Sequence, residues 1–352
     1  MAGSPDSVDR DDARSRARLL QMISGYRFTA VLHVAATLGV ADFLEGGAKD
    51  AEELADKTGA HAPSLLRLLR GLAVMGVVDE VESGRFQLNT IGDLLRTEAP
   101  QSLRGMAART GDEDAMRTWG NLLHTVKTGE TTFDYVHGVP SFDFFAKNPE
   151  ISAGFNRAMV EGTRAAAPAI LDACDFSRFG TIADVGGGSG ALIAAILVEH
   201  PGVRGVLFDT STGAAGAPRL LEKAGVADRC EVVVGDFFVD PLPAGCDAFI
   251  LKSIIHDWDD ARALAILKNC REAISDNGVL VVIEPVMPEK VAAKDPDRSI
   301  VSSDLNMLVN TGGRERTEAE FTELFASTRF KLNAVKPTKA PFPLDVIEAA
   351  PV

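Results

Sequence analysis

The sequence has little of what marks metal-rich, secreted or membrane-bound proteins. Its 352 residues include four cysteines, which lie far apart and form no CxxC pair, so neither structural zinc nor a disulfide framework is expected. No apolar run approaches the roughly 20 residues that cross a bilayer. The polar first residues (MAGSPDSVDRDDARSR) contain no apolar signal core. We therefore expect a cytoplasmic protein with no metal ion and no membrane partner.

Positive charge is scarce as well. Lys and Arg number 36 against 50 Asp and Glu, which gives a formal net charge of −14. Such a surface repels the phosphate backbone of nucleic acids, so no nucleic-acid partner is expected. The length allows two domains, or one large domain with an accessory region.

The first third of the chain shows the pattern of a small helical domain. After a polar stretch over 1–12, expected to be a flexible tail, helical periodicity runs from about residue 13 to 38. Residues 50–53 (DAEE) fit a capping box that opens a short helix. A second helix over 64–75 precedes two strand-like runs that flank Ser83-Gly84, which predicts a hairpin. The order of helix, turn, helix and hairpin predicts a winged-helix domain over 13–109.

A winged helix raises the alternative of a transcriptional regulator. Between Val40 and Arg96 there are ten acidic and six basic residues. A domain that reads DNA has the opposite balance. Charge therefore argues against the regulator, which remains an alternative.

The remainder of the chain changes from helical to alternating character. A mostly helical region over 110–172, with a loop near 129–140, precedes a domain over 173–352 in which short β-branched runs alternate with helical segments. Such alternation indicates right-handed βαβ units. We predict an α/β fold with a Rossmann-like, mostly parallel, seven-stranded sheet. The expected strands are 182–185, 205–208, 231–234, 248–251 and 279–283, with 330–336 and 344–349 as an antiparallel edge. The expected helices are 191–199, 217–224, 260–274 and 318–327.

Glycines and carboxylates stand at the ends of the first three expected strands of this domain. Residues 184–190 (DVGGGSG) end the first strand and open a helix, and glycines there let the backbone approach a ligand closely. Asp209 ends the second strand, where a carboxylate can accept hydrogen bonds from ribose hydroxyls. Asp236, followed by Phe237, comes after the third strand and suits an adenine base. Together they predict a nucleoside site.

The glycine turn is compatible with two kinds of ligand, a dinucleotide such as NAD or a nucleoside that carries a cationic methionine moiety. Gly186, Gly188 and Ala191 formally satisfy GxGxxA, so an NAD-dependent oxidoreductase is an alternative. Asp184 argues against it, because a carboxylate directly before the glycines suits a cationic methionine moiety and fits poorly beside a pyrophosphate. No GK[ST] follows the glycines, which excludes a P-loop.

A histidine and two glutamates are expected at the same edge of the sheet. His256 lies on the loop after the fourth strand, in LKSIIHDW (251–258). An imidazole with an unperturbed pKa near ~6.5 can accept a proton at pH 7. Glu284 ends the fifth strand and Glu315 lies in GGRERT (312–317). Either carboxylate could hold the imidazole in the required tautomer. No cluster has metal-ligand spacing, so we predict metal-free proton transfer.

Over nearly its whole length the chain resembles the class I small-molecule O-methyltransferases, namely the plant caffeate type and bacterial enzymes of aromatic natural-product biosynthesis. The resemblance rests on DVGGGSG (184–190), GDFF (235–238), LKSIIHDW (251–258), IEP (283–285) and GGRERT (312–317) in combination. It implies S-adenosylmethionine as cofactor, no metal, and a homodimer built by the N-terminal domain. It also implies a small aromatic acceptor with a hydroxyl group.

The motif match also implies roles for individual residues. His256 becomes the general base, flanked by Glu284 and Glu315. The cofactor positions are Asp184, Gly186, Gly188, Asp209, Gly235, Asp236, Phe237, Lys252 and Ser253. The acceptor positions are Trp119, Phe155, Met159, Asp257 and Asn306. The family usually has Leu-Pro after the ribose-binding acid, whereas Thr210-Ser211 follow Asp209 here, which leaves the geometry of that loop open.

The reaction itself leaves one alternative. A phenol, with a pKa near ~10, is favoured over an alkyl alcohol because a neutral imidazole can take its proton. The same scaffold could instead use the cofactor without methyl transfer, if the acceptor is displaced from the methyl group.

Overall fold

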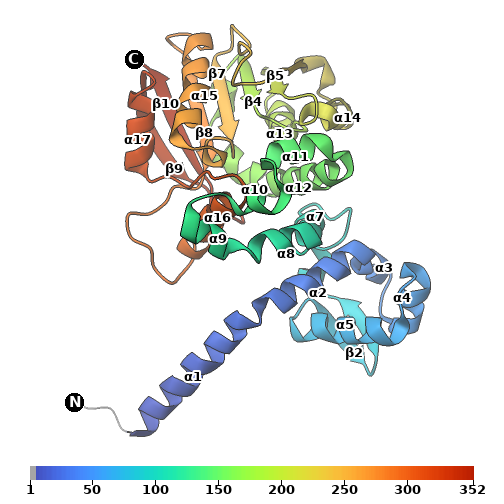
Figure 1. The fold of residues 1–352 in the computed structure, drawn as a ribbon. Coiled ribbons are helices and arrows are strands. Elements are labelled where there is room, and N and C mark those ends of the chain that lie inside the picture. Colours follow the sequence, from blue (N-terminus) through green and yellow to red (C-terminus); the bar gives the residue numbers. More distant parts are fainter. Residues whose placement is uncertain (1–4) are drawn as a thin grey trace. The chain divides into compact units, whose positions relative to one another are not determined.

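The computed structural model describes residues 5–352, with side chains described from Ala13 onward. The chain forms two compact units, the first ending at Met116 and the second comprising Arg117–Val352 (Figure 1). Residues 1–4 of the predicted tail lie outside the described residues, and the backbone is helical from Pro5. The boundary between the units falls slightly beyond the predicted domain boundary at 109.

The first unit has the predicted order of helices and hairpin. The expected helix over 13–38 is two helices, α1 (Pro5–Ile23) and α2 (Gly25–Leu38), which are followed by α3 (Val40–Leu44), α4 (Ala51–Thr58) and α5 (Ala62–Val74). Strands β1 (Lys49–Asp50), β2 (Val78–Glu82) and β3 (Arg85–Leu88) pair in the order β1-β3-β2. Asp50 caps α4 through the predicted capping box. Leu54, Leu69 and Phe86 are wholly buried in the core of this unit.

Short helices connect the hairpin to the sheet. They are α6 (Thr90–Asp93), α7 (Arg104–Thr110), α8 (Glu113–Trp119), α9 (Leu122–Thr128), α10 (Thr132–His137) and α11 (Ser141–Lys147), followed by the long α12 (Pro149–Ala173). The prediction of a loop near 129–140 was wrong in one respect, since α10 lies within these residues. Gly129 and Gly138 have φ of 79° and 75° and end α9 and α10. The glycines therefore end helices rather than mark a long loop.

The predicted seven-stranded sheet is confirmed. Its strands are β4 (Thr181–Val185), β5 (Arg204–Asp209), β6 (Cys230–Val234), β7 (Ala248–Lys252), β8 (Val279–Glu284), β9 (Phe330–Pro337) and β10 (Asp345–Pro351). They lie in the order β6-β5-β4-β7-β8-β10-β9. The first five are parallel, and β10 pairs antiparallel with both β8 and β9. The chain turns from one side of β4 to the other after β6, and ligands bind at the carboxyl ends of strands at such a switch point.

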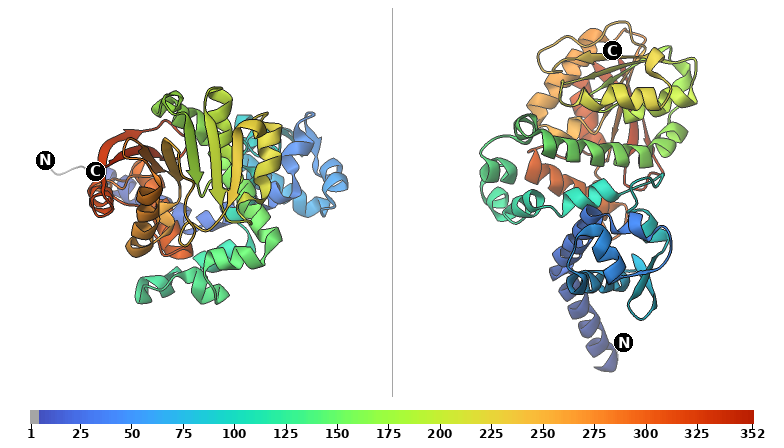
Figure 2. Two further views of the ribbon diagram at one scale, coloured as in Figure 1. Left: turned by 90° about the horizontal axis from the view of Figure 1, so that it is seen from above. Right: turned by 90° about the vertical axis from the view of Figure 1, so that its right-hand side faces the viewer.

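Helices cover both faces of the sheet (Figure 2). On one face α12 packs with α13 (Ala191–Glu199) and α14 (Ala217–Lys223), and on the other lie α15 (Asp260–Ala273) and α17 (Glu318–Ala326). Helix α16 (Asp297–Asn310), which packs against α10, was not predicted. Its serines, asparagines and aspartates favour other backbone conformations in isolation, which masks the helical pattern. No described helix is both long and apolar enough to cross a membrane.

Candidate functional site

The turn after β4 places a buried carboxylate beneath a glycine backbone. Gly186 and Gly188 have φ of 72° and 57°, and a Cβ at Gly186 would collide with the side chain of Ile254. Asp184 is buried, and its Oδ2 has no hydrogen-bond partner among the described residues. Burial raises the pKa of Asp184 to about 7, although the ammonium group of Lys252 opposes this. The turn thus combines close backbone access with an acceptor atom that is still unpaired.

The carboxylate of Asp209 is held in place by three donors. Its Oδ2 accepts a hydrogen bond from the N–H of Gly188 at 2.7 Å, and its Oδ1 accepts from the N–H and the hydroxyl of Thr210 at 2.7 and 3.2 Å. The hydroxyl of Thr210 also accepts from the N–H of Gly213. Gly235 donates to the Asp209 carbonyl and joins the ends of β5 and β6. Thr210, which departs from the family pattern, therefore closes the loop around Asp209.

Aromatic rings line the edge beside β6. Phe237 and Phe238 meet edge to face at 4.8 Å, and Trp258 meets Phe238 at 4.8 Å and Phe237 at 6.2 Å. Asp236 is exposed, and its Oδ1 accepts a hydrogen bond from the N–H of Phe238. These rings form an apolar wall next to a carboxylate, which suits a flat base with an exocyclic amino group.

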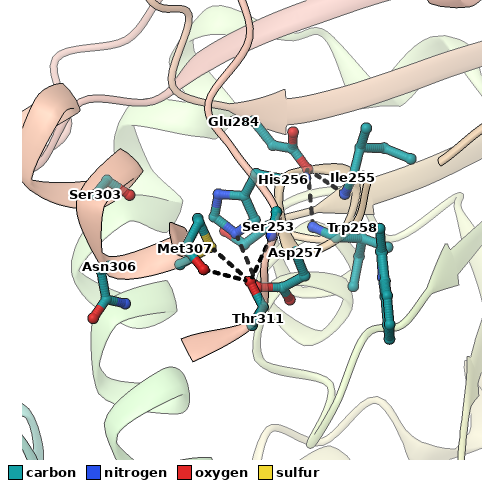
Figure 3. Close-up of polar contacts among 12 residues, drawn as sticks. Ser253, Ile255, His256, Asp257, Trp258, Glu284, Ser303, Asn306, Met307 and Thr311 are labelled. Atoms are coloured by element: carbon teal, nitrogen blue, oxygen red, sulfur yellow. Dashed lines mark hydrogen bonds and ion pairs between the residues drawn. The ribbon is translucent and has the colours of Figure 1, made fainter. Parts of the chain in front are cut away.

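The imidazole of His256 is buried and anchored through one nitrogen. His256 lies on the short helix η4 (Ile255–Asp257), directly after β7. Its Nδ1 is 2.9 Å from Oε1 of Glu315, and the hydroxyl of Ser303 donates to that same oxygen at 2.6 Å. Because an ionised carboxylate only accepts hydrogen bonds, Nδ1 carries the proton and Nε2 is the basic atom of the neutral ring. The Oδ1 atom of Asp257 lies 3.9 Å from Nε2 (Figure 3).

Glu284 holds the backbone of this turn rather than the imidazole. It is wholly buried, and its Oε1 accepts hydrogen bonds from the N–H groups of Ile254, Ile255 and His256 at 2.9, 2.6 and 3.2 Å (Figure 3). Ser253, which precedes the turn, has a φ of 55°, in the left-handed region that few serines adopt. Burial raises the pKa of Glu284 to about 7, partly opposed by His256. Of the two glutamates, only Glu315 contacts the ring.

Charges around His256 shift its protonation. Burial disfavours the imidazolium, but Glu315, Glu284 and Asp257 favour it more strongly, and together they raise the pKa of His256 above its ordinary 6.5. Burial also raises the pKa of Asp257 to about 6. The sequence predicts a pKa near that of free histidine, and the structure corrects this upward because a carboxylate touches the ring.

Lys252 links the cofactor positions to this cluster. It ends β7, and its ammonium donates to the hydroxyl of Ser253 at 3.2 Å. Burial lowers its pKa, while the carboxylates of Asp184, Glu284 and Asp257 act in the opposite direction. The half-buried ammonium group of Lys252 thus interacts with carboxylates of the predicted cofactor site and of the His256 cluster.

Helix α12 carries two of the predicted acceptor residues. Phe155 stacks on Phe145 of α11 with ring centroids 4.8 Å apart, and Met159 is 45% exposed. Asn156, between them, donates to the carbonyl of Thr212 at 3.5 Å. That contact lies on the loop after Asp209, so α12 passes beside the predicted ribose site.

The other acceptor positions lie on separate elements. Trp119 ends α8 and is half-buried. Asn306 lies on α16, one turn after Ser303 (Figure 3). Phe142 of α11 stacks on Trp258 at 5.2 Å, a contact that sequence reasoning did not identify. Among the described residues, no group of three or more His, Cys, Asp or Glu side chains could hold a metal ion.

Sequence reasoning also missed Arg316, although it lies in a motif already singled out for Glu315. Arg316 is 1% exposed and donates to the carbonyls of Ile255 and Trp258, both at 2.9 Å. It also bonds the carboxylate of Asp260 at 2.8 Å. The position of Arg316 next to Glu315 in the same motif was the sequence signal that could have identified it.

Two protein-family models match the chain. Residues 119–331 match the O-methyltransferase domain, and residues 20–98 match the O-methyltransferase dimerisation domain. The second match falls within the first compact unit.

Individual proteins are similar over almost the whole chain. Phenazine O-methyltransferase PhzM of Lysobacter antibioticus is 46% identical over 334 residues, covering 95% of this chain and 96% of the relative. The crystal structure of LaPhzM superposes with a TM-score of 0.90 at 45% identity, covering 96% of this chain and 99% of that one. Aclacinomycin 10-hydroxylase RdmB of Streptomyces purpurascens is 32% identical over 94% of this chain and 89% of its own. The similar proteins therefore include one named for a different reaction.

Proposed function

The chain belongs to the O-methyltransferase family, and we propose that it transfers a methyl group from S-adenosylmethionine to a phenolic hydroxyl of a small aromatic molecule, with His256 as the general base. The observation that carries the proposal is the contact between His256 Nδ1 and Glu315, which leaves Nε2 as the basic atom. The matched catalytic domain also sets aside the transcriptional regulator and the NAD-dependent oxidoreductase. The cytosolic location stays a prediction.

The residues at the switch point fit the methyl donor. Asp184 offers an unpaired buried oxygen to its cationic methionine part, and the carboxylate of Asp209 can accept a ribose hydroxyl. Asp236 and Phe237 suit the adenine, and the backbone at Gly186 allows close approach. When bound, the donor supplies a sulfonium methyl group that is already activated for transfer.

The protein's own residues then deprotonate the acceptor hydroxyl and orient the imidazole of His256. His256 Nε2 would take the proton of the acceptor hydroxyl, and Glu315 would stabilise the resulting imidazolium. The bound donor would supply its methyl group to the freed oxygen as its S–CH₃ bond breaks, and it would leave as S-adenosylhomocysteine. Ser303 holds Glu315, and Glu284 holds the turn that presents the ring. A positioned base is typically worth ~10²–10⁴-fold in rate, and correct alignment of the reacting atoms supplies much of the rest.

The relatives support the proposed class of acceptor and the proposed assembly. A phenazine O-methyltransferase at 46% identity supports a flat aromatic acceptor from natural-product biosynthesis. The dimerisation-domain match supports a homodimer. The relative named a hydroxylase favours a second candidate, in which the same scaffold uses the cofactor without methyl transfer.

The test is transfer of labelled methyl from S-adenosylmethionine to a panel of phenols, preceded by mass spectrometry of the ligand that co-purifies with the protein. Our proposal predicts S-adenosylmethionine or S-adenosylhomocysteine in the purified protein and a labelled aryl methyl ether. Binding of the cofactor with no labelled ether from any phenol would favour the second candidate instead.

A further inference from the structure

The hydroxyl of Ser303 and the imidazole of His256 meet at the same atom. Ser303 lies on α16 and is half-buried, and its hydroxyl donates to Oε1 of Glu315 at 2.6 Å. His256 Nδ1, which carries the ring proton, donates to that same Oε1 at 2.9 Å. Figure 3 shows Ser303 projecting from α16 on the side of His256. Two donors from different elements therefore share one oxygen of Glu315.

The second oxygen of Glu315 does not relieve this sharing. The side chain of Glu315 is wholly buried, and its Oε2 has no hydrogen-bond partner among the described residues. The side-chain donors that stabilise the carboxylate therefore both reach Oε1. A hydrogen bond draws negative charge toward its donor, and inside a protein neighbouring hydrogen bonds influence one another strongly. Each of the two donors thus weakens the hold of Glu315 on the other.

The ring of His256 has other charged neighbours besides Glu315. Two further carboxylates favour its imidazolium, and one lysine interacts with both of them. Within the described chain the Ser303 hydroxyl bonds to Glu315 alone, so its removal leaves these neighbours in place. They are Glu284 of β8, Asp257 of η4 and Lys252 of β7, together with Asp304, which accepts from the N–H of Glu315, and Arg316, which donates to the carbonyl of Ile255.

We infer that Ser303 is a positioning residue that acts through Glu315: by sharing Oε1 with the imidazole, its hydroxyl limits how strongly Glu315 holds the imidazolium, so that more of His256 is in the neutral, proton-accepting form. The inference rests on the proposed function and adds a residue that sets the strength of its base. Burial disfavours the imidazolium, Glu315 raises the pKa of His256, and Ser303 limits that rise.

Valine and threonine at position 303 form a matched pair, because they have nearly the same shape and differ in the hydroxyl. In Ser303→Val the imidazole has Oε1 to itself, and the added methyl groups keep water from replacing the hydroxyl. The pKa of His256 should therefore rise by roughly 0.5–1 pH unit, less than the 1–3 units typical of an adjacent opposite charge. Ser303→Thr should stay close to the native value. Ser302→Val, at an exposed neighbouring position of α16, is the control and should not change the pKa.

Titration followed by NMR of isotope-labelled histidine measures this pKa without any turnover. The chain has six histidines, and the signal that is lost in His256→Ala belongs to His256. A structural role would give the opposite sign, because a loosened Glu315 holds the imidazolium less firmly. A pKa in Ser303→Val that equals the native value or lies below it overturns the inference.

Methyl transfer by the same variants separates this inference from the proposed function. If both hold, the pH–rate profile of Ser303→Val rises at higher pH than the native profile, whereas that of Glu315→Gln rises at lower pH. A raised pKa with no labelled ether from any phenol supports the role of Ser303 and overturns the proposed transfer. Labelled ether with an unchanged pKa in Ser303→Val supports the transfer and overturns the role of Ser303.

Discussion

His256 combines a basic nitrogen with surroundings that favour its protonated form. The contact with Glu315 orients the ring, and in the proposed reaction it would stabilise the imidazolium that His256 forms. The same contact raises the pKa of His256, so less of the neutral form is present at pH 7. The contact with Glu315 therefore orients the imidazole and also makes it more basic. As a consequence, the proposed reaction rate should depend on pH.

This coupling predicts the pH dependence of kcat/KM. His256 must be neutral to accept a proton, so the rate should rise with pH through a pKa above 6.5. Glu315→Gln keeps the shape but removes the negative charge, which lowers that pKa. The rise should therefore move to lower pH, by roughly 1–3 pH units for an ion-pair partner this close, while the plateau rate falls.

A pH–rate profile of both proteins with one phenol checks this. A matched control is Glu289→Gln, in the loop after β8. If the profile of Glu315→Gln rises at the same pH as the native profile, the carboxylate does not set the basicity of His256.

A second prediction for a single residue concerns Asp209 and the affinity for the cofactor. Asp209→Asn replaces a charged acceptor that is already held by Gly188 and Thr210, and hydrogen bonds to charged groups contribute about 1.5–3 kcal/mol. Affinity for S-adenosylhomocysteine should fall roughly 10- to 100-fold by calorimetry. Asp228→Asn, at an exposed turn before β6, should bind normally. Unchanged affinity in Asp209→Asn would show that other residues bind the ribose.

Among the elements, the turn η4 is held from outside by the segment that precedes α17. Arg316 bonds both ends of the turn, through the carbonyls of Ile255 and Trp258. A Cβ at Gly313 would collide with the carbonyl of His256, so the segment lies directly against the turn. The position of His256 therefore depends on a neighbouring element as well as on its own.

We predict that Arg316→Met lowers kcat and stability together. The buried carbonyl of Ile255 and the partly buried carbonyl of Trp258 lose their donor, at about 1–3 kcal/mol for a buried group, and the turn that carries His256 loosens. Arg314→Met is the matched control, since Arg314 contacts the same Asp260 but is 45% exposed. Thermal unfolding and steady-state kinetics of both variants measure the effect. Equal, small losses in both would show that Arg316 does not position the turn.

The elements show how far the sequence could predict this protein. Strands β4 to β8 were predicted within one or two residues, because β-branched runs alternate clearly with helices. Helix α16 was not predicted, because its polar residues mask the helical period. The hydrogen bond of Ser303 to Glu315 and the clamp of Arg316 join segments distant in sequence. Such pairings depend on tertiary packing, which spacing along the chain does not encode.

At the scale of the whole molecule, the dimerisation-domain match and the proposed site fall in different units. The residues of the proposed site lie in the second unit, and the dimerisation match lies in the first. Apolar side chains near the end of α1 are exposed, with Leu20 61% and Ile23 63% accessible. Exposed apolar groups of this kind mark surfaces that bind a protein partner.

These side chains give a prediction about the dimer. Leu20→Glu with Ile23→Glu places charges on that apolar face, so light scattering should show the mass of one chain, where the native protein should show the mass of two. Val239→Glu changes an apolar residue of the second unit that is even more exposed and should leave the dimer intact. A dimer that survives the double substitution would place the interface on other residues.

The most direct measurement of the central claim is the rate of labelled methyl transfer by His256→Ala to an unactivated phenol, at saturating S-adenosylmethionine. Our account predicts a fall of about two to four orders of magnitude, with cofactor affinity retained, because the proposed cofactor residues Asp184 and Asp209 lie on other strands. The loss should shrink for acidic phenols that ionise without help. Transfer at the native rate to the unactivated phenol would show that alignment alone drives the reaction and that His256 is not the base.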